Sequence, residues 1–257
     1  MIYFRYFRMV LGTFLQYRLN MLLVIAGQLF NTLSTFLGLY FLFERFGNID
    51  GWTFGEVAMC YGITITAFAF TECFARGFDV FSGFIRQGTF DRILLRPRST
   101  VLQILGSNVE ITRIGRIAVS AAVLAYAIGE IGVTWSAMRI FTVAMMIVSG
   151  VFVFAGVFML GATVCFWTVD GLEFINIFTN GGKELAAYPL VIYPQRVIQF
   201  FTFVIPYGAF NYLPLMYVTG RSDNALYALS TLLFVPFIAV CLIAWRIGVR
   251  HYVSTGN

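Results

Sequence analysis

Charged side chains are scarce in this sequence. Asp, Glu, Lys and Arg together make up 11% of its 257 residues, whereas soluble domains carry about 25%. Hydrophobic residues account for 60%, and 29 residues are phenylalanine. So few charges cannot cover the surface of an ordinary soluble domain. The composition therefore predicts an all-α, polytopic membrane protein, with residues 1–257 forming a single transmembrane domain.

Histidine and cysteine are also rare. The one histidine, His251, lies near the C-terminus, and the four cysteines fall in apolar stretches at wide spacings. No CxxC pair or metal-ligand spacing is present, and cysteines in such surroundings behave as small buried hydrophobes. The sequence therefore gives no indication of a metal site, and a lone histidine is a poor candidate for a catalytic base.

Nucleotide-binding and hydrolytic motifs are missing. Gly182-Lys183 is followed by Glu184 instead of Ser or Thr, and Ile177 stands where a phosphate-binding loop needs its first glycine. GxSxG and HExxH are absent as well. We therefore expect no catalytic residues, no ATPase site and no bound cofactor in this chain. The net charge of +5 is explained by membrane topology, so no nucleic-acid partner is expected.

Long apolar stretches dominate what is present. The first, residues 21–43, is long enough to cross about 30 Å of hydrocarbon at 1.5 Å per residue. Five are clear, and they cover residues 21–43, 57–74, 117–131, 140–166 and 225–246. In the third, the alanines at small-xxx-small spacing predict close helix contacts; they are Ala118, Ala121, Ala122 and Ala125.

The N-terminal stretch 1–20 has a different pattern. Its apolar residues recur at helical spacing, and Arg5, Arg8 and Gln16 share the opposite face. This pattern predicts an amphipathic helix lying in the membrane interface. A signal peptide is the alternative, but the charged region is too long and no small-residue cleavage site follows.

The fifth span is ambiguous. Hydropathy alone places it at 197–218 and leaves 168–196 in the cytosol. The other interpretation makes 168–188 a span with a polar face and 189–222 a re-entrant, proline-broken segment in the outer leaflet. Both interpretations give six spans with both termini inside, because Lys and Arg gather on the cytoplasmic side.

The most charged interval, residues 76–100, falls on that side. Within it, Arg86–Arg98 holds four arginines and Asp91. Gly88 permits a tight turn, and Pro97 disfavours helix at the residue before it. We expect one or two helical turns from Thr89 to Leu95, with helix resuming at Val101 and entering the membrane. Alone, such a stretch is typical of a solvated, positive-inside connector.

In context, the pattern Gly88-x-x-Asp91-x-x-Leu94-Leu95-Arg96-Pro97, placed between the second and third of six spans, resembles one family. That family is the membrane subunits of type-2 ATP-binding-cassette (ABC-2) exporters. The likeness continues in Tyr188-Pro189 to Pro194, Phe203 to Tyr207, and Tyr212-Leu213-Pro214. It covers nearly the full chain, and the short permeases of the family are the most similar.

The resemblance implies a coupling helix between spans two and three that docks into an ATPase subunit. Carried onto this sequence, Phe90, Ile93 and Leu94 would be the apolar contacts. The remaining coupling residues would be Gly88, Asp91, Arg92 and Arg96. It also implies two partners: two ATPase copies that bind ATP and Mg, and a second permease subunit, identical or related. The protein would lie in the bacterial cytoplasmic membrane, with short re-entrant helices before the last span. That favours the second interpretation of the fifth span.

On this analogy the substrate path would lie between two permeases. Its candidate polar residues lie on the first, second and fifth spans; they are Gln28, Asn31, Thr64, Thr66, Glu72, Glu173, Asn176 and Asn180. Phe30, Phe68 and Phe70 could hold an amphipathic or xenobiotic-like substrate, although lipid contact and packing are the favoured explanation for them. Glu72 could instead pair with Arg76 at i+4.

Three other function classes fit a polytopic protein. A secondary transporter working alone predicts inverted repeats and ionisable residues at the midplane, and no repeat is evident. A membrane-embedded enzyme needs a catalytic cluster, which the sequence lacks. A membrane anchor that transports nothing is compatible with the sequence.

Overall fold

The computed structural model describes residues 12, 18–168 and 172–253. The interfacial helix predicted for residues 1–20 lies almost entirely outside these ranges. The described chain is all-helical, and five helical stretches are long and apolar enough to cross a membrane. They are Arg18–Phe46, Phe54–Arg86, Ile111–Glu130, Ala137–Val164 and Ala225–His251. These stretches match the five clear spans of the sequence to within a few residues at most ends.

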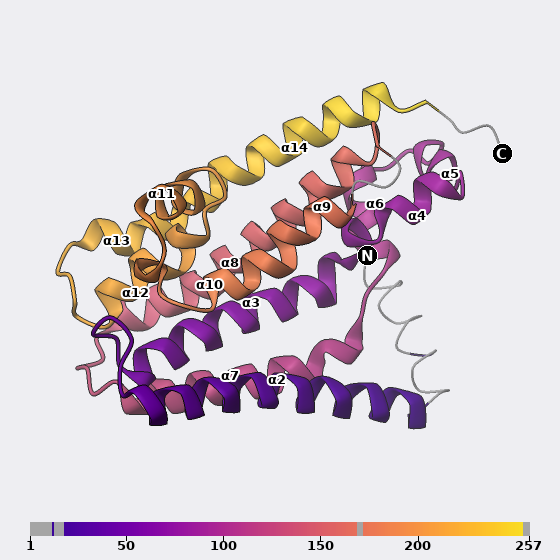
Figure 1. The fold of residues 1–257 in the computed structure, drawn as a ribbon. Helices are drawn as coiled ribbons and strands as arrows, with labels where there is room; N and C mark the ends of the chain where they lie inside the picture. The colour runs from indigo at the N-terminus through magenta and orange to yellow at the C-terminus, as the bar shows by residue number, and fades with distance from the viewer. Residues whose placement is uncertain (1–11, 13–17, 169–171, 254–257) are drawn as a thin grey trace.

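The helix α3 (Phe54–Asp79) forms the centre of the molecule. Some 89% of its most apolar window is buried, against 11% for α2 (Arg18–Phe46). Figure 1 shows α2 and α7 (Ile114–Glu130) on one side of α3, with α8 (Ala137–Val164) and α14 (Phe234–His251) on the other. Because α2 has little of its surface covered, most of its apolar side chains face outward.

Glycines set the closest helix contacts around α3. A Cβ on Gly62 would lie 3.1 Å from the Cα of Leu124, and one on Gly115 would lie 2.7 Å from the carbonyl oxygen of Ile25. Helices without a side chain at the crossing can approach to backbone distance. The four alanines expected to make such contacts are exposed, so within the described chain the close contacts of α7 lie on another face.

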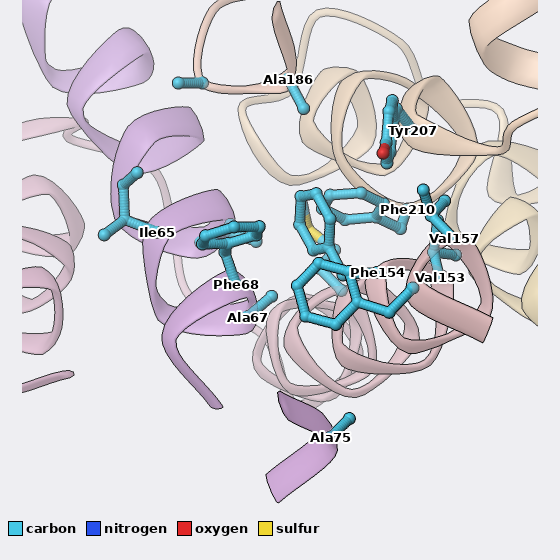
Figure 2. Close-up of a cluster of buried hydrophobic side chains, with 14 of the residues drawn as sticks. Ile65, Ala67, Phe68, Ala75, Val153, Phe154, Val157, Ala186, Tyr207 and Phe210 are labelled. Carbon is cyan, nitrogen blue, oxygen red and sulfur yellow. The ribbon is translucent and has the colours of Figure 1, made fainter. Parts of the chain in front are cut away.

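An aromatic cluster fills the space between α3, α8 and the segment before α12 (Figure 2). The rings of Phe68 and Phe154 meet edge to face, with centroids 5.0 Å apart, and Phe210 lies 5.7 Å from Phe154. Such edge-to-face pairs add to the burial energy of each ring. Phe68 is 1% exposed, so it packs the core.

Three short helices follow α3 at one end of the bundle: α4 (Phe81–Arg86), α5 (Phe90–Leu94) and α6 (Thr100–Ser107). The 33 residues of Phe54–Arg86 span roughly 50 Å, so this helical stretch continues past the hydrocarbon. The helix expected from Val101 forms as α6, but it does not continue into the third span. It stops at Ser107, the backbone is extended at Asn108, and α7 begins separately after a 3-10 turn.

The second half of the chain is broken into short helices. The helix α9 (Leu172–Asn176), a π-helical turn (Ile177–Gly181) and α10 (Gly182–Ala186) form one helical segment along α8. The next helices gather at the end of the bundle opposite α4–α6 (Figure 1). They are α11 (Gln195–Phe203), α12 (Leu213–Val218) and α13 (Ala225–Leu229).

Candidate functional site

The interval between α3 and α7 folds largely as the sequence predicts. The helix α5 covers Phe90–Leu94, inside the stretch expected to be helical. Gly88 has a φ of +62°, a conformation that only glycine adopts without strain. Leu95 donates its backbone N–H to the carbonyl of Asp91, which ends the helix before Pro97. The local signals therefore position α5 correctly along the chain.

Phe90 anchors α5 to the body of the protein. Its ring is fully buried, and it lies 5.1 Å from Phe81, 5.5 Å from Phe166 and 5.0 Å from Tyr252, measured between centroids. Ile93 is only 7% exposed. Phe90 and Ile93 were expected to contact a partner, but in this structure both are buried against their own chain.

The outward side of α5 carries two leucines among arginines. Leu95 is 86% exposed and Leu94 is 39% exposed, while Arg92, Arg96 and Arg98 are also exposed. We call Arg92, Leu94, Leu95, Arg96 and Arg98 the basic leucine surface. An apolar centre with a charged rim is the usual composition of a protein-binding patch. Of the three predicted apolar contacts, only Leu94 belongs to it.

Contacts with α3 and α14 hold this surface in place. A Cβ on Gly77 of α3 would overlap the carbonyl oxygen of Ile104 in α6. The Gln103 amide donates to the carbonyls of Ile93 (3.1 Å) and Arg98 (3.2 Å). The Trp245 indole of α14 donates to Thr100 Oγ1 at 3.0 Å. A movement of α5 is therefore transmitted to two long helices.

We call α4 and α6, the short helices on either side of α5, the platform. An ion-pair network centred on Glu72 lies near the same end of α3. Glu72 Oε2 accepts from Arg116, and Glu72 Oε1 lies 3.3 Å from Arg76 and 3.4 Å from Arg113. Arg113 and Arg76 also reach Glu110, at 3.0 and 3.4 Å. The i+4 partner Arg76 was predictable; Arg113 and Arg116 were not, because they are far away in sequence.

The network is balanced in charge and spans three helices. Arg76 also contacts Asp79 at 2.7 Å, and Arg116 donates to Gln28 Oε1 of α2 at 2.8 Å. Glu72 is 4% exposed. Removing one member of such a buried network leaves an uncompensated charge, which costs more than the intact network contributes. Glu72 is therefore a cross-linking residue of the fold, paired through both carboxylate oxygens.

The other predicted path residues separate into two groups. Thr64 and Thr66 are buried in the core, where Thr64 donates to the Ala186 carbonyl at 2.8 Å and Thr66 donates to Ser120 Oγ at 2.9 Å. Asn31, Asn176 and Asn180 are exposed, whereas Gln28 is half-buried. The side chain of Glu173 lies outside what the structure describes.

Polar side chains form an outward stripe on the helical segment α9–α10. Asn176, Asn180 and Glu184 are exposed at successive i+4 positions. Asn180 Nδ2 lies 3.4 Å from Asn176 Oδ1, and Lys183 Nζ lies 2.8 Å from Glu184 Oε1 and 5.4 Å from the centre of the Phe68 ring. Polar groups at membrane depth need water or a protein partner. This stripe is therefore a candidate for a water-lined surface.

The opposite end of the bundle holds an ion pair that the sequence did not predict. Arg221 contacts Glu56 at 2.6 and 2.7 Å through two nitrogens, and its guanidinium carbon lies 4.2 Å above the Trp52 ring. The carboxylate hydrogen bonds raise the pKa of Arg221 above its ordinary value, so this side chain stays charged at every accessible pH. The one local sequence signal for this region is the capping box Thr53-x-x-Glu56 at the start of α3, which the structure contains.

The described helices also form the walls of two apolar cavities beside α14, each partly open to the outside. One, of about 480 Å³, lies between α8, α9, α11 and α14, and includes Phe178, Phe203 and Phe237 in its wall. The other, of about 450 Å³, lies between α3, α6, α8 and α14. Within the described ranges, no three His, Cys, Asp or Glu side chains are placed so that they could share a metal ion.

Comparison with known proteins assigns the chain to a family. A model of the ABC-2 family transporter proteins matches residues 29–256, which includes the C-terminal part of α2, the other long helices, α5 and the broken segment before α14. No curated protein and no solved structure gives a significant match. Because the family model matches far more than half of the sequence, the chain belongs to the ABC-2 family of transporter membrane proteins.

Proposed function

We propose that this chain is the permease subunit of an ATP-driven exporter, which moves an amphipathic or xenobiotic-like substrate out of the cytoplasm. ABC-2 permeases normally lack an ATPase domain and work with an ATPase partner. Here two ATPase copies would bind ATP and Mg. They would act on two permeases, identical or related, that alternate between inward- and outward-facing states.

The observation that carries the proposal is the way the basic leucine surface is attached. Leu94 and Leu95 are available to a partner, while the buried ring of Phe90 and the Gln103 amide tie the same helix to the platform. The platform is tied in turn to α3 and α14 through Gly77 and Trp245. Mechanical coupling requires a rigid element that presents one face to a partner and contacts the membrane-spanning helices with the other.

The arrangement supports a fifth span within 168–188, where the helical segment 172–186 lies, over one at 197–218. In Figure 1 the α9–α10 segment runs along α8, starting near the end that carries α4–α6, whereas α11 and α12 stay at the far end. The C-terminal end of α14, with Arg246 and Arg250, lies at the α4–α6 end. The positive-inside rule makes that end cytoplasmic. We accordingly propose six spans, with re-entrant helices between 189 and 222 on the outer side of the bacterial cytoplasmic membrane.

The substrate path would lie between two copies. The polar stripe on α9–α10 and the sparsely covered α2 are exposed in the single chain, and both surfaces would meet a second permease. Asn31, Asn176 and Asn180 remain candidates for contact with substrate. Thr64, Thr66 and Glu72 would not contact the substrate; they would stabilise the helices that form the path, because their polar groups are already paired inside this chain.

The decisive experiment replaces Leu95 with serine and measures co-purification of a nucleotide-hydrolysing subunit. Leu95 touches little of its own chain, so L95S is expected to fold normally. A contact at the centre of an interface is worth about 2 kcal/mol or more, so we expect at least about tenfold less bound ATPase and less vanadate-sensitive hydrolysis. The matched control is L226S, since Leu226 is 67% exposed at the opposite end.

Either of two results would contradict the proposal. If no ATPase accompanies the wild-type protein, a secondary transporter or a membrane anchor becomes the better interpretation. If the ATPase binds L95S and L226S equally, the basic leucine surface is not the docking site.

A further inference from the structure

The cavity of about 450 Å³ between α3, α6, α8 and α14, the α14 cavity, is lined almost entirely by hydrocarbon. Its wall includes Phe74, Phe78, Leu105 and Leu242. Thr71 is the one hydroxyl among the lining residues, and it already donates to the carbonyls of Ala67 and Val151 at 2.9 and 3.1 Å. The cavity therefore offers a ligand no free hydrogen-bonding group, and water has too few polar partners to fill it.

Close helix contacts keep the cavity from collapsing. A Cβ on Gly156 of α8 would lie 2.7 Å from the Phe237 ring, so α14 cannot approach α8 more closely there. At the other end, the Trp245–Thr100 hydrogen bond fixes α14 against α6. Because α6 stops at Ser107, no helix fills the space between these contacts. The volume lies within the range of about 300–1,000 Å³ that holds small ligands in proteins.

The cavity faces the membrane. Phe74 and Phe152, both in its wall, are 38% and 44% exposed, and α3, α8 and α14 each belong to a stretch long enough to span the bilayer. The molecules next to such an opening are lipids. An acyl chain matches the lining in chemistry, since both are hydrocarbon.

Two arginines follow or precede lining residues at one end of the cavity, although neither is part of its wall. Arg246 follows the lining residue Leu242 by four residues on α14 and so lies on the same helix face. Arg98 precedes the lining residue Val101 by three residues. The hydrogen bond between Trp245 and Thr100 brings the two chain segments together. Both arginines are exposed, and neither has an ion-pair partner among the residues that the structure describes.

We propose that the α14 cavity binds one acyl chain of an anionic phospholipid, whose phosphate contacts Arg246 and Arg98. The site requires only that these helices cross the membrane; its placement in the cytoplasmic leaflet rests on the orientation proposed above. The lipid would join α14 to α6, the helix next to the basic leucine surface. The other cavity beside α14 has no comparable pair of arginines at its edge.

The test uses the full chain, with any partner that co-purifies, in lipid nanodiscs. The probes are phosphatidylglycerol and phosphatidylcholine, each carrying a photoactivatable diazirine within one acyl chain. We expect phosphatidylglycerol to label peptides that contain Leu105 and Leu242 about thirtyfold more than phosphatidylcholine does. That ratio corresponds to ~2 kcal/mol, the contribution of two arginines near anionic lipid.

Variants at three places in the molecule make the result specific. Arg246→Gln should reduce the preference for phosphatidylglycerol to about fivefold, because only Arg98 then remains near the phosphate. Ala155→Leu, which places a larger side chain in the cavity, should abolish labelling by both lipids; Val151→Leu serves the same purpose if A155L fails to fold by size-exclusion chromatography. Arg196→Gln, an exposed arginine on α11 at the other end, should change nothing.

Equal labelling by the two lipids in the wild type, or undiminished labelling of a folded cavity-filling variant, would overturn the proposal. Co-purification of the ATPase with A155L is recorded in the same preparation. Loss of the lipid site can therefore be distinguished from failure of the proposed transport function.

Discussion

At the scale of single residues, the structure changes the interpretation of Glu72 more than that of any other predicted site residue. In an apolar helix, an acidic residue suggests a functional site. The structure surrounds this carboxylate with three arginines from two helices. Its position is explained by packing and charge balance, and no contact with substrate is needed to account for it.

Replacing Glu72 by glutamine should therefore act mainly on stability. The change leaves Arg113 and Arg116, which are 11% and 12% exposed at the side chain, without their shared carboxylate. Breaking a buried pair from one side costs about 3–5 kcal/mol. We expect a clearly lower unfolding temperature for E72Q in detergent, measured by intrinsic fluorescence.

Two further variants separate this effect from others. The double variant E72Q/R116Q should recover part of the loss, because it removes the unpaired charge together with its partner. E44Q, at an exposed carboxylate near the end of α2, should unfold as the wild type does. A normal unfolding temperature for E72Q, with transport lost, would instead return Glu72 to the substrate path.

At the scale of elements, the contact between α3 and α6 positions the docking platform. Gly77 is needed there because the backbone of α6 occupies the place of a side chain. Glycine in a helix normally weakens it relative to alanine, so its presence in the central helix reflects this contact. The same sequence offers a second glycine, Gly83 in α4, with open space around it.

We expect opposite outcomes at the two glycines. G77A should push α6 away from α3, with an overpacking cost of about 1–3 kcal/mol, and should reduce coupled ATPase activity. G83A adds a methyl group in open space and should leave stability unchanged or slightly raised. Thermal unfolding and ATPase activity of both variants provide the measurement. Equal behaviour of G77A and G83A would show that α6 is not held by this contact.

At the scale of the whole molecule, the path of the chain after α8 decides the topology. A fifth span at 172–186 puts Arg196 outside, whereas a span at 197–218 leaves it in the cytosol. The four native cysteines are buried, so an introduced exposed cysteine can be labelled selectively. This single position therefore distinguishes the two topologies.

We expect Arg196→Cys to react with a membrane-impermeant maleimide added to intact cells. Arg96→Cys, on the basic leucine surface, should react only after the membrane is opened. Labelling is read by gel shift. If Arg196→Cys is protected in intact cells and reacts together with Arg96→Cys, the re-entrant arrangement is wrong, and so is the outer placement of α11.

Most of the long helices and the position of α5 were predictable from the sequence. Their signals are local: an apolar run of sufficient length, a glycine before α5 and a proline after it. The orientation of each helix about its axis was not predictable. In a membrane the lipid-facing side of a helix is as apolar as its packed side, so periodicity could not show that Phe90 faces inward or that the alanines of α7 face outward.

By itself, then, the sequence determined that this is an all-helical membrane protein with five clear spans and a short basic helix between the second and third. Composition and chain-local signals are enough for that. Only the tertiary structure decided which charges pair across helices, as Glu72 does with Arg116 and Glu56 with Arg221. It also decided that Leu94 and Leu95 lie outward while Phe90 lies inward. These contacts join residues far apart in sequence, and they depend on how helices cross, which no local pattern encodes.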